Sequence, residues 1–596
     1  MRERRRMHLT TLDWVIVVVS LLVTFVPAVV LARRSGRNTT EFFAAGRKAP
    51  WWLIGVSLVA TTFSTDTPNL VTNFVRTGGI AANWQWWAFL LTGMATVFFY
   101  ARMWRRSAAL TDLEFYELRY SGKAASYVRG IRAVYLGLIF NCAIIATVNL
   151  AAVKIAAVLF GWQEWQTLLF CALIPILFAA IGGLWGVMVT DMIQFCITIT
   201  GAFAAAYFAL QNPQVGGLHQ LFAHIQAHAP SALALLPNFN DPKTALAIFI
   251  LPLTVQWWSV WYPGAEPGGG SYVAQRMLAA KTESDAMGGT LFFQVMHYAL
   301  RPWPWIIVAL ASMVVFPTLH DIHTAFPYVP NRLIGDDIAY PAMLTFLPAG
   351  FAGLMIAGIF AAYRSTLETH LNWGCSYLVH DLYRRFIRTD AEEKHYVAVG
   401  RMVTALIMFI AIGVTFFIDT ASDGFQVLLS IGAGTGLLYL LRWFVPRINA
   451  WSEISAMCAS PLVAVGILVA KAHGVAIDSS LSLITSVVIT SIVWIVVTML
   501  TPPSDDATLV RFYERVRPFG PGWAAIRARC GTLVAAPDSP ARSLAGWFCG
   551  IGLVYGALFG TGAFLFGNTL AGILAILLCC ACLYAIRSLY PRYPQS

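Results

Sequence analysis

The chain has 596 residues, of which 58% are hydrophobic and only 12% are charged. A soluble protein of this size carries about twice that share of charged residues, so the composition excludes a soluble globular protein. Apolar runs of roughly 20 residues recur from end to end, and they must be helical because lipid offers no partner to free backbone amides. The sequence therefore predicts an all-α polytopic membrane protein.

About fifteen apolar segments are expected to be transmembrane helices. In chain order they cover residues 13–33, 51–75, 82–104, 129–159, 164–183, 185–210, 244–262, 287–316, 340–379, 397–418, 423–444, 450–472, 480–500, 546–567 and 568–588. The first follows a basic start, but it is long for a signal peptide and ends directly in arginines. We therefore expect a retained anchor helix.

The net charge of +11 is explained by where the basic residues lie. With the loop after the first helix placed inside, the basic clusters at 33–48, 102–132, 384–401 and 511–542 fall inside. The outside loops then receive only Arg76, Lys243, Arg332 and Lys471. This pattern predicts a multi-pass protein of the plasma membrane with a cytoplasmic C-terminus and no nucleic-acid partner. The N-terminus is expected outside, although the arginines within residues 2–6 oppose that placement.

A polar stretch interrupts the apolar segment 51–75. SLVATTFSTDTPNLV, residues 57–71, holds several hydroxyl side chains, a carboxylate at Asp66 and a proline at Pro68. Proline has no amide proton and clashes with the preceding turn, so a helix through it bends or opens. One interpretation is a discontinuous helix whose freed carbonyls bind an ion and a solute. The other is a proline kink in which the hydroxyls bond back to the helix.

Ionisable residues within apolar segments are costly in lipid and usually face an internal cavity or a partner. The sequence has a small set of them, and functional residues are to be sought there: Asp66, Lys154, Asp191, His297, Arg301, Arg364 and Glu368.

Five motifs lie at or near these segments: FFAAGRKAPWW, ATTFSTDT, GGLWGVMVTD, YVAQRMLAAK and AAYRSTLETHLN. Together they resemble the sodium:solute symporter family, which contains sodium-coupled proline, sugar and pantothenate carriers. The resemblance extends over residues 40–450, approximately. It implies a LeuT-like core of two inverted five-helix repeats. WYPGAEPGGGS, residues 261–271, supports this independently, because paired breaks in two halves of a transporter point to a binding site.

The resemblance also implies a division of the chain. Residues 51–210 and 244–444 would form the two repeats, joined by an extracellular loop at 211–243. Residues 1–50 would hold the anchor helix and a cytoplasmic loop. Residues 445–596 would hold peripheral helices and a basic cytoplasmic loop at 501–545.

Five oxygens are implied as the sodium site. The backbone carbonyls of Ala60, Phe63 and Ala362 would act with the hydroxyls of Ser365 and Thr366. Taken alone, those hydroxyls would more often bond back to their own helix.

Asp191, in VTDMIQF, matches a family aspartate that lines the inward sodium exit. Its alternative role is to stabilise the start of a helix, where a carboxylate is also favourable.

At the expected substrate residues the sequence departs from the family pattern. His297 falls where related sugar carriers place a lysine that touches the substrate, and Thr67 falls where they place a glutamine. These departures favour an organic anion, or an amino acid such as proline, over a neutral sugar. Asp66 and the stretch Gln256, Trp257 and Trp258 would line the same cavity. Arg301 would pair with an anionic substrate, neutralise Asp66, or cap the helix that Pro302 and Pro304 interrupt.

Arg364 and Glu368 flank the serine–threonine pair at positions where relatives are usually uncharged. Their i,i+4 spacing places both side chains on one helical face, where they can meet. One interpretation is a structural ion pair. The other is that the pair also tunes the sodium site or recognises substrate charge.

Other classes of protein fit the sequence less well. No GxxxxGK[ST] phosphate loop of an ATP-driven pump occurs. The longest polar segment, 501–545, is too short for a kinase, and HDIH at 320–323 is the nearest approach to an enzymatic site. We expect a sodium-coupled importer of a small organic solute, with sodium as coupling ion, no organic cofactor and no enzymatic activity. The alternative is a transport-inactive sensory protein on the same fold.

Overall fold

A computed structural model describes residues 7, 9–35, 45–109, 111–178, 184–259, 266–432, 434–530 and 535–590. Within these ranges the regular structure is helical, apart from one pairing of extended backbone between Ala49 and Ala280. The helices up to the middle of the chain are α1 (Thr11–Ser35), α3 (Trp51–Thr61), α4 (Asp66–Gly78), α5 (Trp84–Trp87), α6 (Leu90–Ala95), α7 (Ala101–Ser107), α8 (Glu114–Arg119), α9 (Gly122–Val134), α10 (Asn141–Phe160), α11 (Glu164–Phe178), α12 (Leu184–Leu210), α13 (Leu218–His228), α14 (Pro242–Ala245), α15 (Leu251–Thr254), α16 (Ser271–Ala279) and α17 (Glu283–Val295).

The remaining helices are α18 (Pro302–Val315), α19 (Leu319–Ala325), α20 (Ala339–Leu344), α21 (Phe351–Ser376), α22 (Glu393–Thr415), α23 (Ala421–Gly432), α24 (Gly436–Leu441), α25 (Ala450–Ala472), α26 (Ser479–Leu500), α27 (Asp506–Val516), α28 (Ala524–Arg527), α29 (Pro540–Leu565) and α30 (Thr569–Leu589). Wider π-helical turns continue several of them, among them η3 (Thr96–Tyr100), η4 (Tyr135–Phe140) and η8 (Met296–Leu300). Short 3₁₀ segments include η7 (Gln256–Trp258), η9 (Asn331–Leu333) and η10 (Asp336–Ile338).

Eight helices in the described part of the chain are long and apolar enough to cross a membrane, which bears out the membrane class. Three shorter apolar helices, 11–24, 51–61 and 242–254, add to them. The expected total of about fifteen spans stays a prediction.

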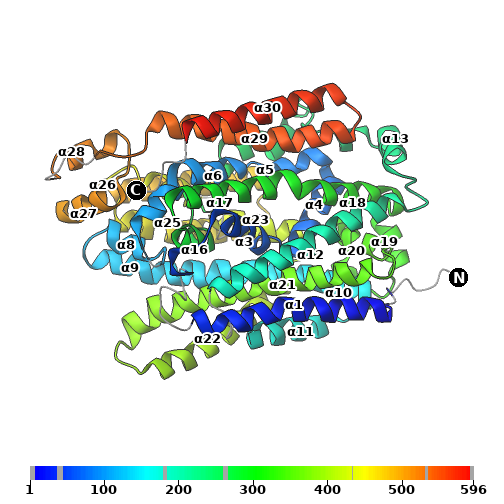
Figure 1. The fold of residues 1–596 in the computed structure, drawn as a ribbon, viewed down its shortest axis with the longest axis horizontal. Helices are drawn as coiled ribbons and strands as arrows, with labels where there is room; N and C mark the ends of the chain where they lie inside the picture. The colour runs from blue at the N-terminus through cyan, green and yellow to red at the C-terminus, as the bar shows by residue number, and fades with distance from the viewer. Residues whose placement is uncertain are drawn as a thin grey trace.

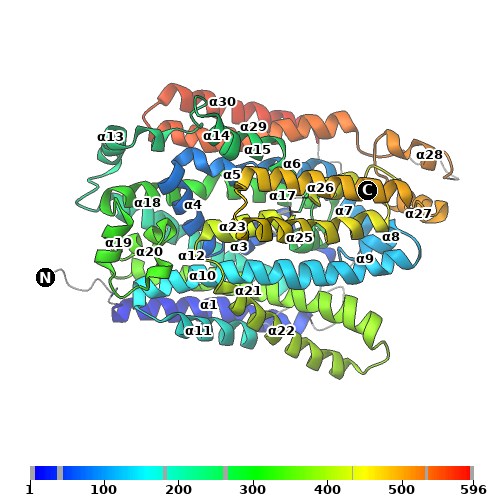
Figure 2. The same cartoon turned by 180° about the vertical axis from the view of Figure 1, so that it is seen from behind.

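The long helices run side by side along the longest axis of the molecule (Figures 1 and 2). α29 and α30 lie along one flank, and α1, α11 and α22 lie along the other. The helices α3, α4, α10, α17, α18 and α21 lie between these flanks. α13, α19 and α20 mark one end of the bundle, and α8, α27 and α28 mark the opposite end.

Helix starts in the loops follow ordinary capping chemistry. The Thr282 hydroxyl accepts the amide of Asp285 at 3.0 Å and so begins α17. Thr318 and Asp321 form a reciprocal capping box at the start of α19. Such caps supply partners for amides that have none within the helix, so loop sequence fixes where each helix begins.

Candidate functional site

The predicted break in the first core helix is a true discontinuity. α3 ends at Thr61 and α4 begins at Asp66, leaving residues 62–65 outside regular helix. The Thr62 hydroxyl donates to the carbonyl of Leu58 at 3.0 Å, so part of the kink interpretation also holds. Pro68 is the third residue of α4, where an amide would have no partner within the helix. It therefore suits the start of the second half-helix rather than bending a continuous one.

Arg301 holds the break from the neighbouring helix. Its Nη2 donates to the carbonyl of Thr62 at 2.8 Å, and its Nη1 donates to the Thr62 hydroxyl at 3.0 Å. Its guanidinium also lies over the ring of Phe63, 4.4 Å from the centroid. Arg301 is fully buried. The helix that it caps is thus the broken first core helix and not the one that begins at Pro302.

The same arginine fixes the protonation of His297. Arg301 Nη1 lies 2.8 Å from His297 Nδ1. A guanidinium can only donate hydrogen bonds, so Nδ1 is the acceptor and the imidazole proton is on Nε2. His297 is therefore a neutral side chain whose remaining ring nitrogen is a donor.

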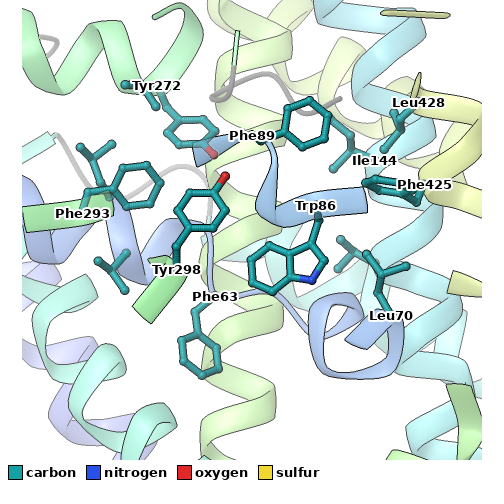
Figure 3. Packing of buried hydrophobic residues seen from close by; sticks show 14 of the residues in the cluster. Phe63, Leu70, Trp86, Phe89, Ile144, Tyr272, Phe293, Tyr298, Phe425 and Leu428 are labelled. Atoms are coloured by element: carbon teal, nitrogen blue, oxygen red, sulfur yellow. The ribbon is translucent and has the colours of Figure 1, made fainter. Parts of the chain in front are cut away.

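A cavity opens beside the break. Its lining residues come from α4, α6, η3, α16, α17, η8 and the loops between them: Thr62, Ser64, Asp66, Thr67, Leu70, Phe89, Thr92, Gly93, Thr96, Tyr272, Val273, Phe293, Gln294, His297 and Tyr298. Figure 3 shows the Tyr272 and Tyr298 hydroxyls pointing toward one another, with Phe89 and Phe293 to either side. The cavity thus combines aromatic faces with a few polar groups, as small-molecule sites do.

The predicted substrate residues divide into two groups. Asp66, Thr67 and His297 line the cavity, whereas Arg301 lies behind its wall. Gln256, Trp257 and Trp258 in η7 are also outside the lining: the Gln256 side chain donates to the carbonyl of Gln85, and the carbonyl of Trp257 accepts the hydroxyl of Thr92. Since Thr92 does line the cavity, η7 supports the wall from outside.

Sequence reasoning missed Gln294 and the tyrosines of the cavity wall. Gln294 is one turn before His297, so a search of the helix face around that histidine would have found it. No motif marks Tyr272 or Tyr298, and only their packing shows their place.

The predicted sodium residues lie where α21 meets the end of α3. Thr366 Oγ1 is 3.5 Å from the carbonyl oxygen of Thr61, and the Ala60 carbonyl accepts the amide of Phe63 at 3.0 Å. Ala362 precedes Thr366 by one turn on α21. The atoms that could coordinate a cation here are the oxygens of hydroxyl and carbonyl groups. No cluster of three or more His, Cys, Asp or Glu side chains suited to a metal occurs among the described residues.

Asp191 joins three helices at this point. Its carboxylate accepts the hydroxyl of Ser57 at 2.7 Å and the hydroxyl of Ser365 at 2.9 Å. Arg276 Nη2 lies 3.9 Å from the same carboxylate. Asp191 is fully buried and stands well past the first turn of α12, which begins at Leu184. The alternative role at a helix start is therefore wrong.

Arg364 and Glu368 meet on α21, with 3.2 Å between Arg364 Nε and Glu368 Oε1. The arginine side chain is 5% exposed and the glutamate side chain 24%. The predicted i,i+4 pair is present, one residue from Ser365.

The family model that matches is that of the sodium:solute symporter family, over residues 42–460. The chain is 25% identical over 443 residues to a sodium/glucose cotransporter of Vibrio parahaemolyticus, covering 71% of this chain and 78% of that protein. It is 27% identical over 432 residues to a sodium/mannose cotransporter of Bos taurus, covering 68% and 69%. It is 26% identical over 411 residues to a sodium/myo-inositol cotransporter of Canis lupus familiaris, covering 64% and 55%.

Among solved structures, that of a Na⁺-coupled sialic acid symporter matches with a TM-score of 0.64 at 19% identity, covering 83% of this chain and 99% of that one. This likeness concerns the fold and confirms the LeuT-like architecture expected from the motifs. Because the family model spans more than two thirds of the chain, the protein belongs to the sodium:solute symporter family and is a sodium-coupled transporter rather than an enzyme.

Proposed function

We propose that the protein imports a neutral, polyhydroxylated, sugar-like solute together with sodium by alternating access. The names of the related proteins support a sugar-like solute: glucose, mannose and myo-inositol. They disfavour the amino acid or organic anion that the departures at Thr67 and His297 suggested. The observation that carries the proposal is the charge balance of the cavity.

Among the described residues that line the cavity, Asp66 is the one carboxylate and none is a lysine or an arginine. The positive charge that acts on Asp66 comes from Arg301, whose guanidinium bonds to Thr62 and His297 behind the wall. The two charges offset one another, and His297 is neutral. A charged solute would have to be desolvated here without a counter-charge of its own, which is costly. A neutral solute avoids that cost.

The polar atoms of the cavity suit hydroxyl groups. Asp66 Oδ1 and Gln294 Oε1 are buried and have no hydrogen-bond partner among the described residues, and the Ser64 hydroxyl interacts with the Asp66 side chain. Each such atom costs about 1–3 kcal/mol if it stays unsatisfied, so a solute that brings several hydroxyl donors gains affinity. His297 Nε2 supplies a donor in return. Related sugar carriers have a glutamine at the position of Thr67, and here the side-chain amide of Gln294 would take its place.

Sodium would bind between the broken helix and α21. We assign the carbonyls of Ala60, Phe63 and Ala362 and the hydroxyls of Ser365 and Thr366 as its ligands. The approach of Thr366 to Thr61 supports this assignment. Asp191 accepts the Ser365 hydroxyl and would guide the ion inward from the site.

Uptake into proteoliposomes tests the proposed function. With an inward sodium gradient, labelled glucose, mannose or myo-inositol should accumulate, whereas an equal potassium gradient should give no accumulation. Sialic acid and proline should be taken up at least tenfold more slowly. Preferred uptake of sialic acid or proline would contradict the neutral-solute assignment.

Thermal unfolding provides an independent measurement, because a bound solute raises apparent stability by mass action. The solute that is transported should raise the melting temperature more in sodium than in potassium. Gln294→Leu should abolish this rise, while Gln226→Leu on the exposed face of α13 should leave it intact. Equal responses of the two variants would remove Gln294 from the site.

A further inference from the structure

α4 has a polar face although it lies inside the protein. At 3.6 residues per turn, five of its polar side chains fall within an arc of about 120°: Asp66, Asn69, Thr72, Asn73 and Arg76. The opposite face carries Val71 and Val75, which are fully buried. A helix enclosed by protein has no need of such a face for solubility.

The polar side chains in the middle of this face have no hydrogen-bond partners among the described residues. Asn69 and Thr72 are 0% exposed and Asn73 is 8% exposed. The side-chain oxygens of all three, and the amide nitrogen of Asn69, are buried with no hydrogen-bond partner in the part of the chain that the structure describes. These groups are costly in the closed arrangement and become favourable once water or a hydrated solute reaches them.

The two ends of the face differ. Asp66 lines the cavity, and Arg76 is ten residues further on, about 15 Å along the helix. Arg76 Nε donates to Asp336 Oδ1 at 2.8 Å, and its Nη1 donates to the carbonyl of Phe316 at 2.9 Å. The polar face thus leads from the cavity to an ion pair at the end of the molecule where α19 and α20 lie (Figure 1).

Asp336 is part of a short segment that binds several helices at once. We call residues 331–338 the latch. Asp337, which follows Asp336, accepts two hydrogen bonds from Lys154 of α10, at 2.7 and 2.8 Å. It also accepts one from the backbone amide of Ala421 at the start of α23. Asp336 and Asp337 thereby bind α4, α10 and α23, which come from both expected repeats.

Arg332 extends the same latch. It pairs with Glu164 at the start of α11 and with Asp419 before α23, at 3.3 Å for the latter. Three residues of the latch, Arg332, Asp336 and Asp337, therefore form ion pairs with four helices or their flanking loops around the C-terminal end of α4. Opening that end requires these pairs to separate.

We propose that the polar face of α4 is the outer access route to the cavity and that the latch, through Asp336 and Asp337, holds it shut. The route is closed in this structure because Asn69, Thr72 and Asn73 are buried. Release of the two aspartates would let water reach the unpartnered groups, which offsets part of the loss of the ion pairs. The proposal rests on the contacts above and not on the identity of the solute.

Cysteine accessibility tests the proposal in the full-length protein in proteoliposomes. Asn69→Cys and Thr72→Cys report the polar face, and Val71→Cys is the matched control on the opposite face at the same depth. A membrane-impermeant methanethiosulfonate is applied, and the mass of the peptide that contains the new cysteine gives its labelling rate. Measuring the mass of that peptide distinguishes labelling of the introduced cysteine from labelling of the ten native cysteines.

The latch is weakened in two ways. Asp336→Asn removes the charge of a partly exposed aspartate, and Lys154→Gln with Asp337→Asn removes both buried charges while keeping polar side chains. We expect labelling at Asn69→Cys and Thr72→Cys to become at least tenfold faster in both backgrounds, with Val71→Cys unchanged. Unchanged rates at the two polar positions would overturn the proposal, and so would an equal gain at Val71→Cys, which would indicate general loosening.

Transport is measured separately on the same samples. If the labelling result holds but no sugar is taken up, the proposed function fails and the access route stands. If sugars are taken up but labelling does not respond to the latch, only the access route fails.

Discussion

At the scale of single residues, Arg301 shows how a buried charge can stabilise the helix break beside the candidate site. An arginine at the centre of a bilayer costs roughly 2.5–3.5 kcal/mol on insertion scales. Here the cost is offset by hydrogen bonds to Thr62 and His297 and by the rings of Phe63 and Trp305. The sequence indicates that Arg301 is unusual, but its partner Thr62 is 239 residues away, and no local pattern connects the two.

The hydroxyls of Ser365 and Thr366 give the most direct test of the sodium site. Thr366→Ala removes one neutral oxygen without harming the helix, since alanine is the best helix former. We expect the sodium concentration for half-maximal uptake to rise about tenfold, the effect of losing about 1.4 kcal/mol of binding free energy. Sodium-dependent uptake of a labelled solute measures it, and Thr366→Ser, which keeps the hydroxyl, is the control. Wild-type sodium dependence in both Thr366→Ala and Ser365→Ala would refute the assignment.

Arg364 and Glu368 are expected to act as a structural pair. Glu368→Ser alone leaves the buried arginine without its carboxylate and should lower thermal stability. The loss should stay below the roughly 3–5 kcal/mol of a fully buried pair, because Glu368 is partly exposed. Arg364→Met combined with Glu368→Ser should restore both stability and uptake. A double variant that is stable yet inactive would show that the pair takes part in transport.

At the scale of elements, the break between α3 and α4 was predictable because its causes are local. Hydroxyls, a carboxylate and a proline within one apolar segment all disfavour a continuous helix there. The second predicted break is partly described: residues 266–270 are not helical, and α16 begins at Ser271. The remainder, residues 261–265, lies outside the described part. The wall of the cavity was not predictable in the same way, because Thr92, Tyr272 and Gln294 come from different helices and share no motif.

Helix packing beside the break depends on two glycines. A Cβ at Gly289 of α17 would lie 2.8 Å from the carbonyl oxygen of Trp51 and 2.8 Å from the Cβ of Ile54, both on α3. A Cβ at Gly55 would in turn lie 2.9 Å from the carbonyl oxygen of Gly289. The backbones of α3 and α17 are therefore too close for any side chain at these two positions.

Gly289→Ala should accordingly destabilise the protein by about 1–3 kcal/mol, the usual cost of overpacking. Gly466→Ala on α25 is the matched control, because a Cβ there meets nothing within 4 Å. Alanine favours a helix over glycine by up to about 1 kcal/mol, so the control should be neutral or slightly more stable. Thermal unfolding in detergent compares the two. A similar melting temperature for both variants would mean that α3 and α17 can move apart at little cost.

At the scale of the whole molecule, polar contacts join helices at both ends of the bundle. At the end where α8 and α27 lie, Arg132 pairs with Glu266, and Asp112 accepts the amide of Ser271 at 2.9 Å. At the other end the latch holds α4. Ion pairs and hydrogen bonds have discrete broken and formed states, so they suit the alternating access that we propose.

The orientation of these two ends relative to the membrane is a prediction of the charge pattern alone. α13 and α14, with few basic residues near them, lie toward one end, and α27 lies at the opposite end (Figure 2).

Lys243 and Arg515 are exposed at these two places and serve as probe positions. In right-side-out membranes an impermeant thiol reagent should label Lys243→Cys and should fail to label Arg515→Cys until the membrane is permeabilised. The positive-inside rule gives the reason, since the basic residues at 511–542 are retained on the cytoplasmic side. The parent chain, treated identically, accounts for reaction at native cysteines. Labelling of Arg515→Cys in sealed membranes, with Lys243→Cys protected, would reverse the orientation; the latch would then face the cytoplasm, and the transport direction proposed above would be wrong.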